Sequence, residues 1–102
     1  MKVVITDFSL RELKSIHSYY KKNVSNDVAD KLLNKILDSI DVLEIASLAG
    51  TIEQNLKSLG LNHRYIVAGN YKIIFRISDE MLYVTDVFDT RQNPKKILLR
   101  SK

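Results

Sequence analysis

Cysteine is missing from the 102-residue sequence, and histidine occurs only twice, as His17 and His63. Without cysteine the chain forms neither disulfides nor thiolate metal sites; this favours a reducing compartment, and we expect the cytoplasm. Two histidines are too few for a histidine-built metal site, so we expect no metal and no other cofactor. Apolar runs long enough to span a membrane are also missing, and Asp7 interrupts the N-terminus before the core of a secretion signal could form.

Acidic residues are missing from the C-terminal part of the chain. Apolar residues make up 45 % of the sequence, and this composition and length predict one globular domain over residues 1–102. The net charge is +4, and the basic charge is concentrated after residue 90, in Arg91, Lys95, Lys96, Arg100 and Lys102. Such a stretch is either a solvated tail or a contact for phosphate or for an acidic protein.

Two helices are predicted in the first half of the chain. The β-branched run over residues 2–6 predicts a short strand, and a helix follows it with Ser9 as the expected N-cap. A second helix, capped by Ser25 or Asn26, has a broad apolar face and is expected to run to about Ala49. Because the link between the helices is very short, they should form an antiparallel hairpin.

The second half of the chain is predicted to form a sheet. Residues 51–62 have no clear periodicity and predict a loop, whereas from residue 63 onward the hydrophobic period is two. Three strands follow, and Pro94–Leu99 is either a short helix or an extended tail. The predicted fold is α+β: an N-terminal strand, a helix hairpin and a three-stranded antiparallel meander, with the helix pair on one sheet face and the other face open. The predicted strands are His63–Val67, Tyr71–Ile77 and Leu82–Phe88.

The register of the first hairpin decides which cations reach the open face. A two-residue loop would place Arg64 opposite Phe75 in the core, whereas a three-residue loop would place it opposite Ile74. Because an isolated buried guanidinium costs several kcal/mol, we predict the three-residue loop. The register of the second hairpin decides whether Asp86 pairs with a cation or turns inward, and the sequence leaves both alternatives open. The prediction gathers a cationic cluster on the open face: Arg64, Lys72 and Arg76, with Arg91 at its end.

Two segments resemble those of a known toxin family. The stretch from Gly60 to Ile77 (GLNHRYIVAGNYKIIFRI) resembles the central signature of RelE/ParE superfamily toxins, in which a strand Arg precedes Gly-Asp/Asn-Tyr-Arg/Lys and an apolar run. The stretch from Val87 to Pro94 resembles the family's closing segment, a strand end followed by Arg and a turn. With the helix pair, these motifs make the chain similar to toxins of type II toxin–antitoxin systems, among them plasmid stabilisation proteins.

The resemblance implies a toxin that a small antitoxin protein holds inactive. RelE-type members cleave mRNA on the ribosome, whereas ParE-type members bind and poison DNA gyrase. Arg64 and Arg91 match the family's strand and post-strand arginines, and with His63 they are the weak catalytic candidates. The cations expected to bind a target or phosphate are Arg64, Lys72, Arg76, Arg91, Lys95 and Lys96.

The ribonuclease pattern is incomplete in this sequence. Ile66 and Thr90 stand where the nucleases often carry a basic residue and a histidine, and no tyrosine follows Pro94. RNA cleavage needs proton-transfer groups as well as cations, and His63 alternates with packed strand residues, so we expect it to be packed rather than to act as a base. We therefore predict a toxin that acts by binding, with an altered-site ribonuclease or an inactive nucleic-acid-binding relative as the alternatives.

Overall fold

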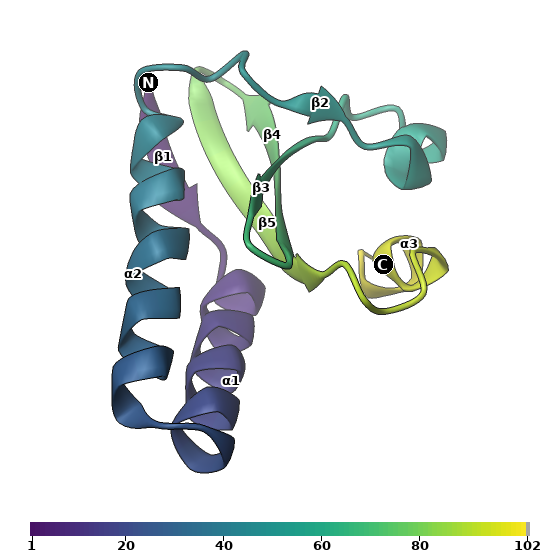
Figure 1. The fold of residues 1–102 in the computed structure, drawn as a ribbon. Helices are drawn as coiled ribbons and strands as arrows, with labels where there is room; N and C mark the ends of the chain where they lie inside the picture. The colour runs from purple at the N-terminus through teal and green to yellow at the C-terminus, as the bar shows by residue number, and fades with distance from the viewer. Residues whose placement is uncertain (102) are drawn as a thin grey trace.

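The computed structural model describes residues 1–101, and it confirms the predicted α+β fold (Figure 1). The loop predicted over residues 51–62 is wrong, because a short strand and a 3-10 helix form there. The C-terminal segment is a short helix. Along the chain the elements are β1 (Lys2–Ile5), α1 (Asp7–Asn23), α2 (Asn26–Val42), β2 (Thr51–Ile52), the 3-10 helix η1 (Gln54–Leu59), β3 (Arg64–Ala68), β4 (Tyr71–Ser78), β5 (Met81–Asp89) and α3 (Lys95–Arg100).

Helix α1 begins earlier than predicted. Thr6 is its N-cap, and the Thr6 hydroxyl accepts a hydrogen bond from the Ser9 backbone N–H. The prediction that Ser9 is the cap is wrong because Ser9 is fully buried inside the first turn, where its hydroxyl donates to the Val84 carbonyl at 2.9 Å. This bond ties the start of α1 to β5.

Helix α2 has the predicted cap, Ser25, but ends at Val42 rather than near Ala49. A series of turns then carries the chain to Gly50, which lies against the ring of Phe75. A Cβ atom on Gly50 would lie 2.6 Å from that ring, so only glycine allows this approach. Within residues 1–101, no helix is both long and apolar enough to cross a membrane.

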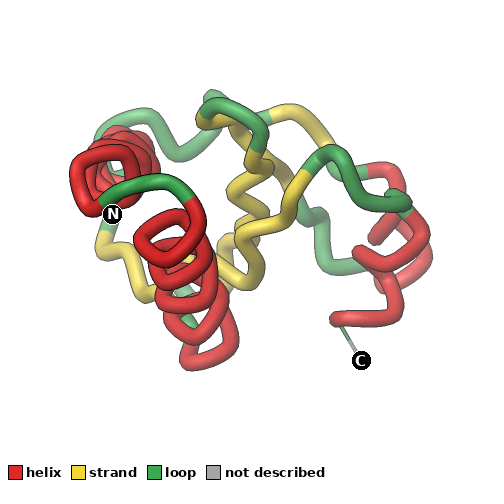
Figure 2. The backbone as a smooth tube through the Cα atoms, turned by 60° about the horizontal axis from the view of Figure 1, so that its bottom comes forward, coloured by secondary structure: helices red, strands yellow, loops and turns green. Residues whose placement is uncertain are grey.

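The strands form one sheet in the order β1-β5-β4-β3-β2. Strands β3, β4 and β5 are the predicted antiparallel meander, β1 pairs with β5 in parallel, and β2 adds two residues beside β3. Figure 2 shows α1 and α2 on one side of the sheet and the short helices on the other. The predicted packing of the helix pair on one face is confirmed; the buried side chains of that core include Leu13, Ile36, Ile40, Leu43, Ile73, Phe75 and Val84.

The second sheet face is covered, whereas the sequence predicts an open face. Helices η1 and α3 cover much of it, and a smaller core forms from Leu56, Ile74, Phe88 and Ile97 (Figure 1). Alternation within one strand shows that a face exists but not which distant segments cover it. The face that alternation predicts to be exposed and cationic is therefore largely buried.

The register of the first hairpin also differs from the prediction. Ala68 pairs with Tyr71, so the loop has two residues and Arg64 stands opposite Phe75. This register does not bury an unpaired guanidinium, because Arg64 lies near the edge of the sheet and is only partly buried. The guanidinium also donates a hydrogen bond to the Gly50 carbonyl at 2.8 Å. The expected gathering of Arg64 with Lys72 on one face is wrong.

A bulge in β5 settles the place of Asp86. The register shifts between Ile74 and Phe75, and Asp86 lies opposite Ile74. Its side chain lies on the face that α3 covers, where Arg100 donates to it at 2.7 Å. Asp86 is therefore buried and paired, with a cation from the C-terminal helix rather than with Lys72.

Candidate functional site

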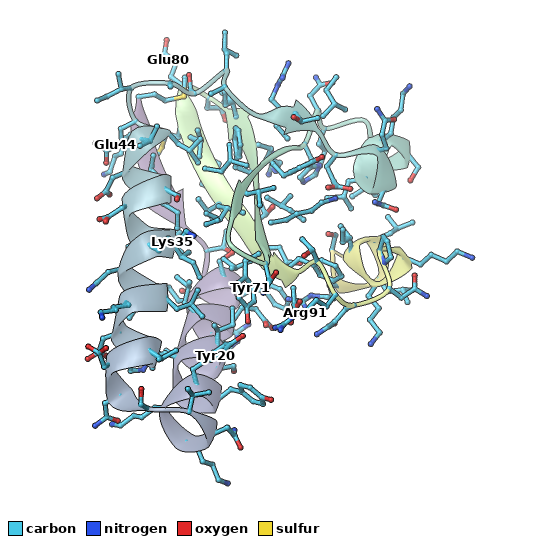
Figure 3. All side chains as sticks on the ribbon, in the orientation of Figure 1. Tyr20, Lys35, Glu44, Tyr71, Glu80 and Arg91 are labelled. Carbon is cyan, nitrogen blue, oxygen red and sulfur yellow. The ribbon has the colours of Figure 1, made fainter. Side chains whose placement is uncertain are left out.

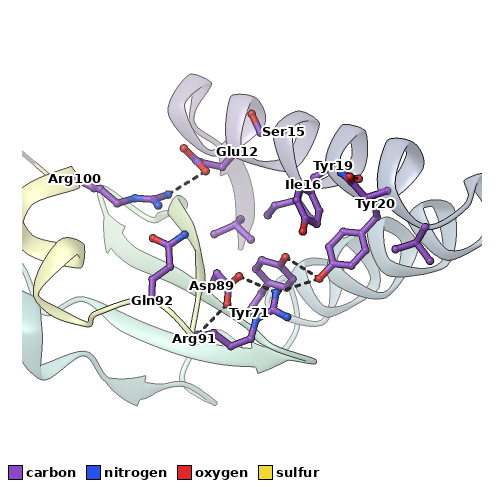
Figure 4. A pocket seen from close by; sticks show the side chains of 13 residues that line it. Glu12, Ser15, Ile16, Tyr19, Tyr20, Tyr71, Asp89, Arg91, Gln92 and Arg100 are labelled. Carbon is purple, nitrogen blue, oxygen red and sulfur yellow. Dashed lines mark hydrogen bonds and ion pairs between the residues drawn. The ribbon is translucent and has the colours of Figure 1, made fainter.

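A groove of about 570 Å³ lies between α1 and the C-terminal end of β5 (Figure 4). Residues three and four positions apart share one face of a helix, and this spacing brings a polar row of α1 to the groove. The opposite wall comes from β4, from the end of β5 and from the turn after it. Its polar lining includes Glu12, Ser15, Tyr20, Asn23, Asp89, Arg91 and Gln92.

Arg91 is the centre of a hydrogen-bond network in this groove. Its Nε and Nη2 atoms donate to the two carboxylate oxygens of Asp89, at 2.9 and 2.8 Å. Nη2 also donates to the hydroxyl of Tyr20 at 3.1 Å, and the Tyr71 hydroxyl donates to the same oxygen at 3.5 Å. The network joins α1, β4 and the end of β5, as Figure 4 shows.

The network changes the acidity of its members. The hydrogen bonds from Tyr71 and Arg91 lower the pKa of Tyr20, while burial raises the pKa of Tyr71. The guanidinium holds the pKa of Asp89 below its ordinary value, so Asp89 is a weak base. Because Tyr20 accepts both bonds, its own proton is free for donation to a group bound in the groove.

The Arg91–Asp89 pair makes the groove polar without giving it a strong positive charge. The side chain of Arg91 is 56 % exposed, so a ligand in the groove can reach it. A guanidinium already paired with a carboxylate offers hydrogen bonds rather than a free cation. Chemically, this arrangement suits a peptide surface with carbonyl or hydroxyl groups.

Lys72 is neutralised on the second face of the sheet. Its ammonium lies 2.9 Å from the carboxylate of Glu53 and 4.2 Å from the ring centre of Tyr65. Glu53 is 1 % exposed; burial raises its pKa, but hydrogen bonds from Lys72 and Asn55 outweigh burial and hold the pKa below its ordinary value. Lys72 is thus a structural ion-pair partner, in contrast to the free phosphate contact that the sequence analysis expects.

Arg100 forms a second neutralised cluster on the same face. It donates to buried Asp86 at 2.7 Å, lies 3.2 Å from Glu12 of α1, and stands 5.3 Å from the rings of Phe8 and Phe88. Burial raises the pKa of Asp86, and the charge of Arg100 opposes that rise. This cluster fastens α3 to β5 and α1.

The remaining predicted cations divide between two other places. Arg64 and Arg76 line the same small hollow at the edge of the sheet, whereas Lys95 and Lys96 are exposed at the start of α3. Among residues 1–101, no three His, Asp or Glu side chains are placed together to hold a metal ion.

His63 is 5 % exposed, as its alternation predicts. Burial lowers its pKa, Arg76 lowers it further, and Glu53 opposes both effects. A buried neutral histidine without access to a substrate does not serve as a general base.

Arg64 and Arg91 lie at different ends of the sheet. Arg64 stands opposite Phe75, while Asp89, two residues before Arg91, stands opposite Tyr71. Phe75 and Tyr71 are four positions apart on β4, which corresponds to about 13 Å at about 3.3 Å per residue. Figure 3 shows Tyr71 and Arg91 at one end of the sheet and Glu80 at the other.

The comparison with protein families identifies the chain. The family model described as ParE toxin of type II toxin-antitoxin system, parDE, matches residues 3–94. The chain belongs to this family. The resemblance to RelE/ParE superfamily toxins that the motifs predict is thereby confirmed.

Solved structures agree with the fold of this ParE-family toxin. One, described as a chromosomal ParDE TA system from P. aeruginosa, matches with a TM-score of 0.75 over 87 % of this chain and 95 % of that chain. The sequence identity is 14 %, so this match shows the fold alone. No curated protein sequence matches the toxin significantly.

Sequence reasoning missed three residues of the groove in this ParE-family toxin. Tyr20 belongs to the apolar stripe of α1, and Tyr71 and Asp89 lie within the two family-like segments. The available signal was a pair of tyrosines in otherwise apolar stripes, since a buried phenol needs a hydrogen-bond partner. Only the long-range pairing of Tyr71 with Asp89 brings the partner, Arg91, to them.

Proposed function

We propose that this ParE-family toxin arrests growth by binding its target through the groove beside Arg91, and that a cognate antitoxin neutralises it. DNA gyrase, the target implied by the resemblance to ParE-type toxins, is the first candidate. The groove supports this proposal because it is large enough for protein side chains and offers hydrogen-bonding groups from α1, β4 and the end of β5.

The observation that carries the proposal is the separation of Arg64 from Arg91. The two arginines line different cavities, so they do not hold one phosphate between them. Near Arg64 the candidate base, His63, is buried, and the Thr90 hydroxyl beside Arg91 donates to the Asn70 carbonyl. Binding needs no proton transfer, whereas RNA cleavage does.

Ribosome-dependent mRNA cleavage is the alternative, and one contact favours it. The Tyr20 hydroxyl lies 3.1 Å from Arg91, which places an acid–base group beside a cation. Against it stands Asp89, which neutralises that cation and has a lowered pKa. A nucleic-acid-binding relative without activity would use the exposed Lys95 and Lys96 alone, whereas in the proposed toxin these two lysines add to the contacts that the groove makes with the target.

Two assays on the same protein separate these functions. The toxin is expressed, mRNA 5′ ends are mapped on ribosomes, and supercoiling by purified gyrase is measured with added toxin. We expect supercoiling to be inhibited and no new codon-positioned 5′ ends to appear. Rapid cleavage with supercoiling unaffected would make the altered-site nuclease the correct function. No effect in either assay, with growth unaffected, would indicate the inactive relative.

A further inference from the structure

The groove beside Arg91 holds no surplus positive charge, although the net charge of the sequence is +4. Two acids and two cations line the groove, and each acid lies within ion-pair distance of one cation. The carboxylate of Asp89 is 2.8 Å from Arg91, and the carboxylate of Glu12 is 3.2 Å from Arg100. A phosphate that entered the groove would therefore meet paired cations and two carboxylates rather than a basic pocket.

The hydrogen-bonding fork of Arg91 is already in use. A guanidinium binds a phosphate best through two parallel N–H bonds, which come from Nε and Nη2 or from Nη1 and Nη2. Nε and Nη2 donate to Asp89, and Nη2 also donates to Tyr20, so both N–H groups of Nη2 are occupied (Figure 4). Among residues 1–101, only Nη1 is left for a ligand, and no complete fork remains for a phosphate.

Asp89 is held in this position by its own turn. Its Oδ1 atom also accepts a hydrogen bond from the backbone N–H of Arg91 at 2.9 Å, and its side chain is only 21 % exposed. The neighbouring guanidinium lowers the pKa of Asp89, so the carboxylate stays charged at neutral pH. A phosphate would have to break three hydrogen bonds to take the place of this carboxylate.

Two hydrogen-bond donors remain beside each other in the groove. One is Nη1 of Arg91, and the other is the hydroxyl of Tyr20, whose oxygen accepts bonds from Arg91 and Tyr71 and so keeps its own proton for a ligand. A carbonyl oxygen has two lone pairs and no charge, so it accepts both bonds without repulsion from Asp89. Peptide groups and the side chains of asparagine and glutamine supply such an oxygen.

We propose that Asp89 makes the groove select a protein carbonyl over a phosphate. Asp89 occupies the fork of Arg91, repels an anionic ligand, and leaves the donors of Arg91 and Tyr20 for one carbonyl oxygen. This inference rests on the proposed function, since it requires a protein target in the groove. Asp89 is thus a specificity-determining residue, and removal of its charge turns the groove into a phosphate site.

The test measures how the full toxin binds a fluorescein-labelled single-stranded oligouridine RNA and, in parallel, purified gyrase. The variants are Asp89→Asn and the double variant Asp89→Asn with Arg91→Gln, and thermal unfolding checks that each variant folds. Asparagine keeps an oxygen that accepts the backbone N–H of Arg91. The matched control is Asp79→Asn, at an exposed acid in the turn after β4 whose left-handed backbone (φ 52°) asparagine adopts readily.

We expect Asp89→Asn to bind the RNA about tenfold more tightly than the wild type, because the fork of Arg91 becomes free for a phosphate. Asp79→Asn makes the same change in net charge and should alter RNA affinity less than about twofold, and the double variant should lose the gain. Wild-type RNA affinity in folded Asp89→Asn, with gyrase binding retained, would overturn the inference and leave the proposed function standing. A wild type that binds the RNA but not gyrase would overturn the proposed function, and this inference with it.

The wild-type toxin supplies a measurement that depends on no variant. The NMR signal of the Arg91 Nε–H should stay in place when inorganic phosphate is added, because Asp89 keeps that N–H in its own hydrogen bond. A shift of this signal that saturates with phosphate would show that the fork is open to anions and would overturn the inference.

Discussion

Arg91 is held by residues that lie far apart in the chain. Asp89 is two residues away, but Tyr20 comes from α1 and Tyr71 from β4. The cation was predictable from the sequence through its family-like segment. The hydrogen-bond partners that neutralise Arg91 were not predictable. Alternation and motif spacing give the position of a residue along its own helix or strand, but not its contacts with residues of other elements. The same holds for Lys72, whose acid partner Glu53 comes from the segment between two strands.

Removal of the Tyr20 hydroxyl separates binding from proton transfer. For a toxin that binds, Tyr20→Phe loses one hydrogen bond to a charged group, and affinity falls about tenfold. A proton-transfer role would instead lower the rate by about 10²- to 10⁴-fold. We expect the smaller effect on the toxin concentration that halves supercoiling. The control is Tyr19→Phe on the same groove wall, and a hundredfold loss in Tyr20→Phe alone would contradict the proposal.

The Lys72–Glu53 pair should be essential to the stability of the toxin. Lys72→Met leaves the Glu53 carboxylate buried without its cation, and we expect the free energy of unfolding to fall by about 3–5 kcal/mol. The double variant Lys72→Met with Glu53→Gln should recover most of this loss. Urea denaturation measures both, with exposed Lys57→Met as the control. A loss in Lys72→Met no larger than in the control would show that the pair contributes little.

The same pair predicts a dependence of stability on pH. The pKa of Glu53 lies below its ordinary value of 4.5, so the stabilisation is present above pH 4.5 and is lost as the pH falls through the lowered pKa. The double variant should therefore lose less stability on acidification than the wild type. Parallel urea titrations from pH 7 to pH 3 measure the difference. An equal loss of unfolding free energy with falling pH in the wild type and the double variant would argue against a lowered pKa for Glu53.

At the scale of elements, local signals predict the long helices and strands, and long-range contacts decide the rest. Ser25 caps α2 as predicted, because the cap is a short-range feature. Strand β2 and helix η1 give no periodicity in the sequence, since one has two residues and the other is a 3-10 helix. The end of α2 was missed because the approach of Gly50 to Phe75, which shapes the chain after Val42, is a tertiary contact.

Helix α3 presents the exposed basic residues of the C-terminal stretch. Lys95 and Lys96 are exposed, while Ile97 packs on the second sheet face, so the helix fixes the direction of the two cations. We predict that Lys95→Glu with Lys96→Glu relieves growth arrest while the toxin stays folded, because contacts with phosphate or an acidic surface depend on charge. The measurement is colony formation after induction, with circular dichroism for folding.

The matched control for this charge reversal is Lys14→Glu with Lys35→Glu, two exposed lysines on the helix hairpin. It makes the same change in net charge at another surface. Undiminished arrest in the α3 variant, or equal relief in both variants, would contradict a specific role for the basic stretch.

At the scale of the whole molecule, the sheet has two covered faces and a cavity at each end. The sequence predicts the helix hairpin on one face. It does not predict the second core formed by η1 and α3, because helices this short have too few residues to show a clear hydrophobic period. The expected cationic face divides accordingly: Lys72 becomes internal, Arg64 and Arg76 line a small hollow at the edge of the sheet, and Arg91 lies in the groove at the far end. This division separates Arg64 and Arg76 from the proposed target site beside Arg91.

Direct binding of purified gyrase to Arg91→Glu tests the central claim, that the toxin acts by binding through the Arg91 groove. The substitution places a carboxylate beside Asp89, and like charges in contact oppose the hydrogen bonds that a target needs. Because Arg91 is more than half exposed, the unfolding temperature should change little. We predict that the wild-type toxin binds gyrase and that Arg91→Glu, still folded, binds at least a hundredfold more weakly. Equal binding by the two proteins, or no binding by the wild type while it cleaves mRNA on ribosomes, would contradict the claim.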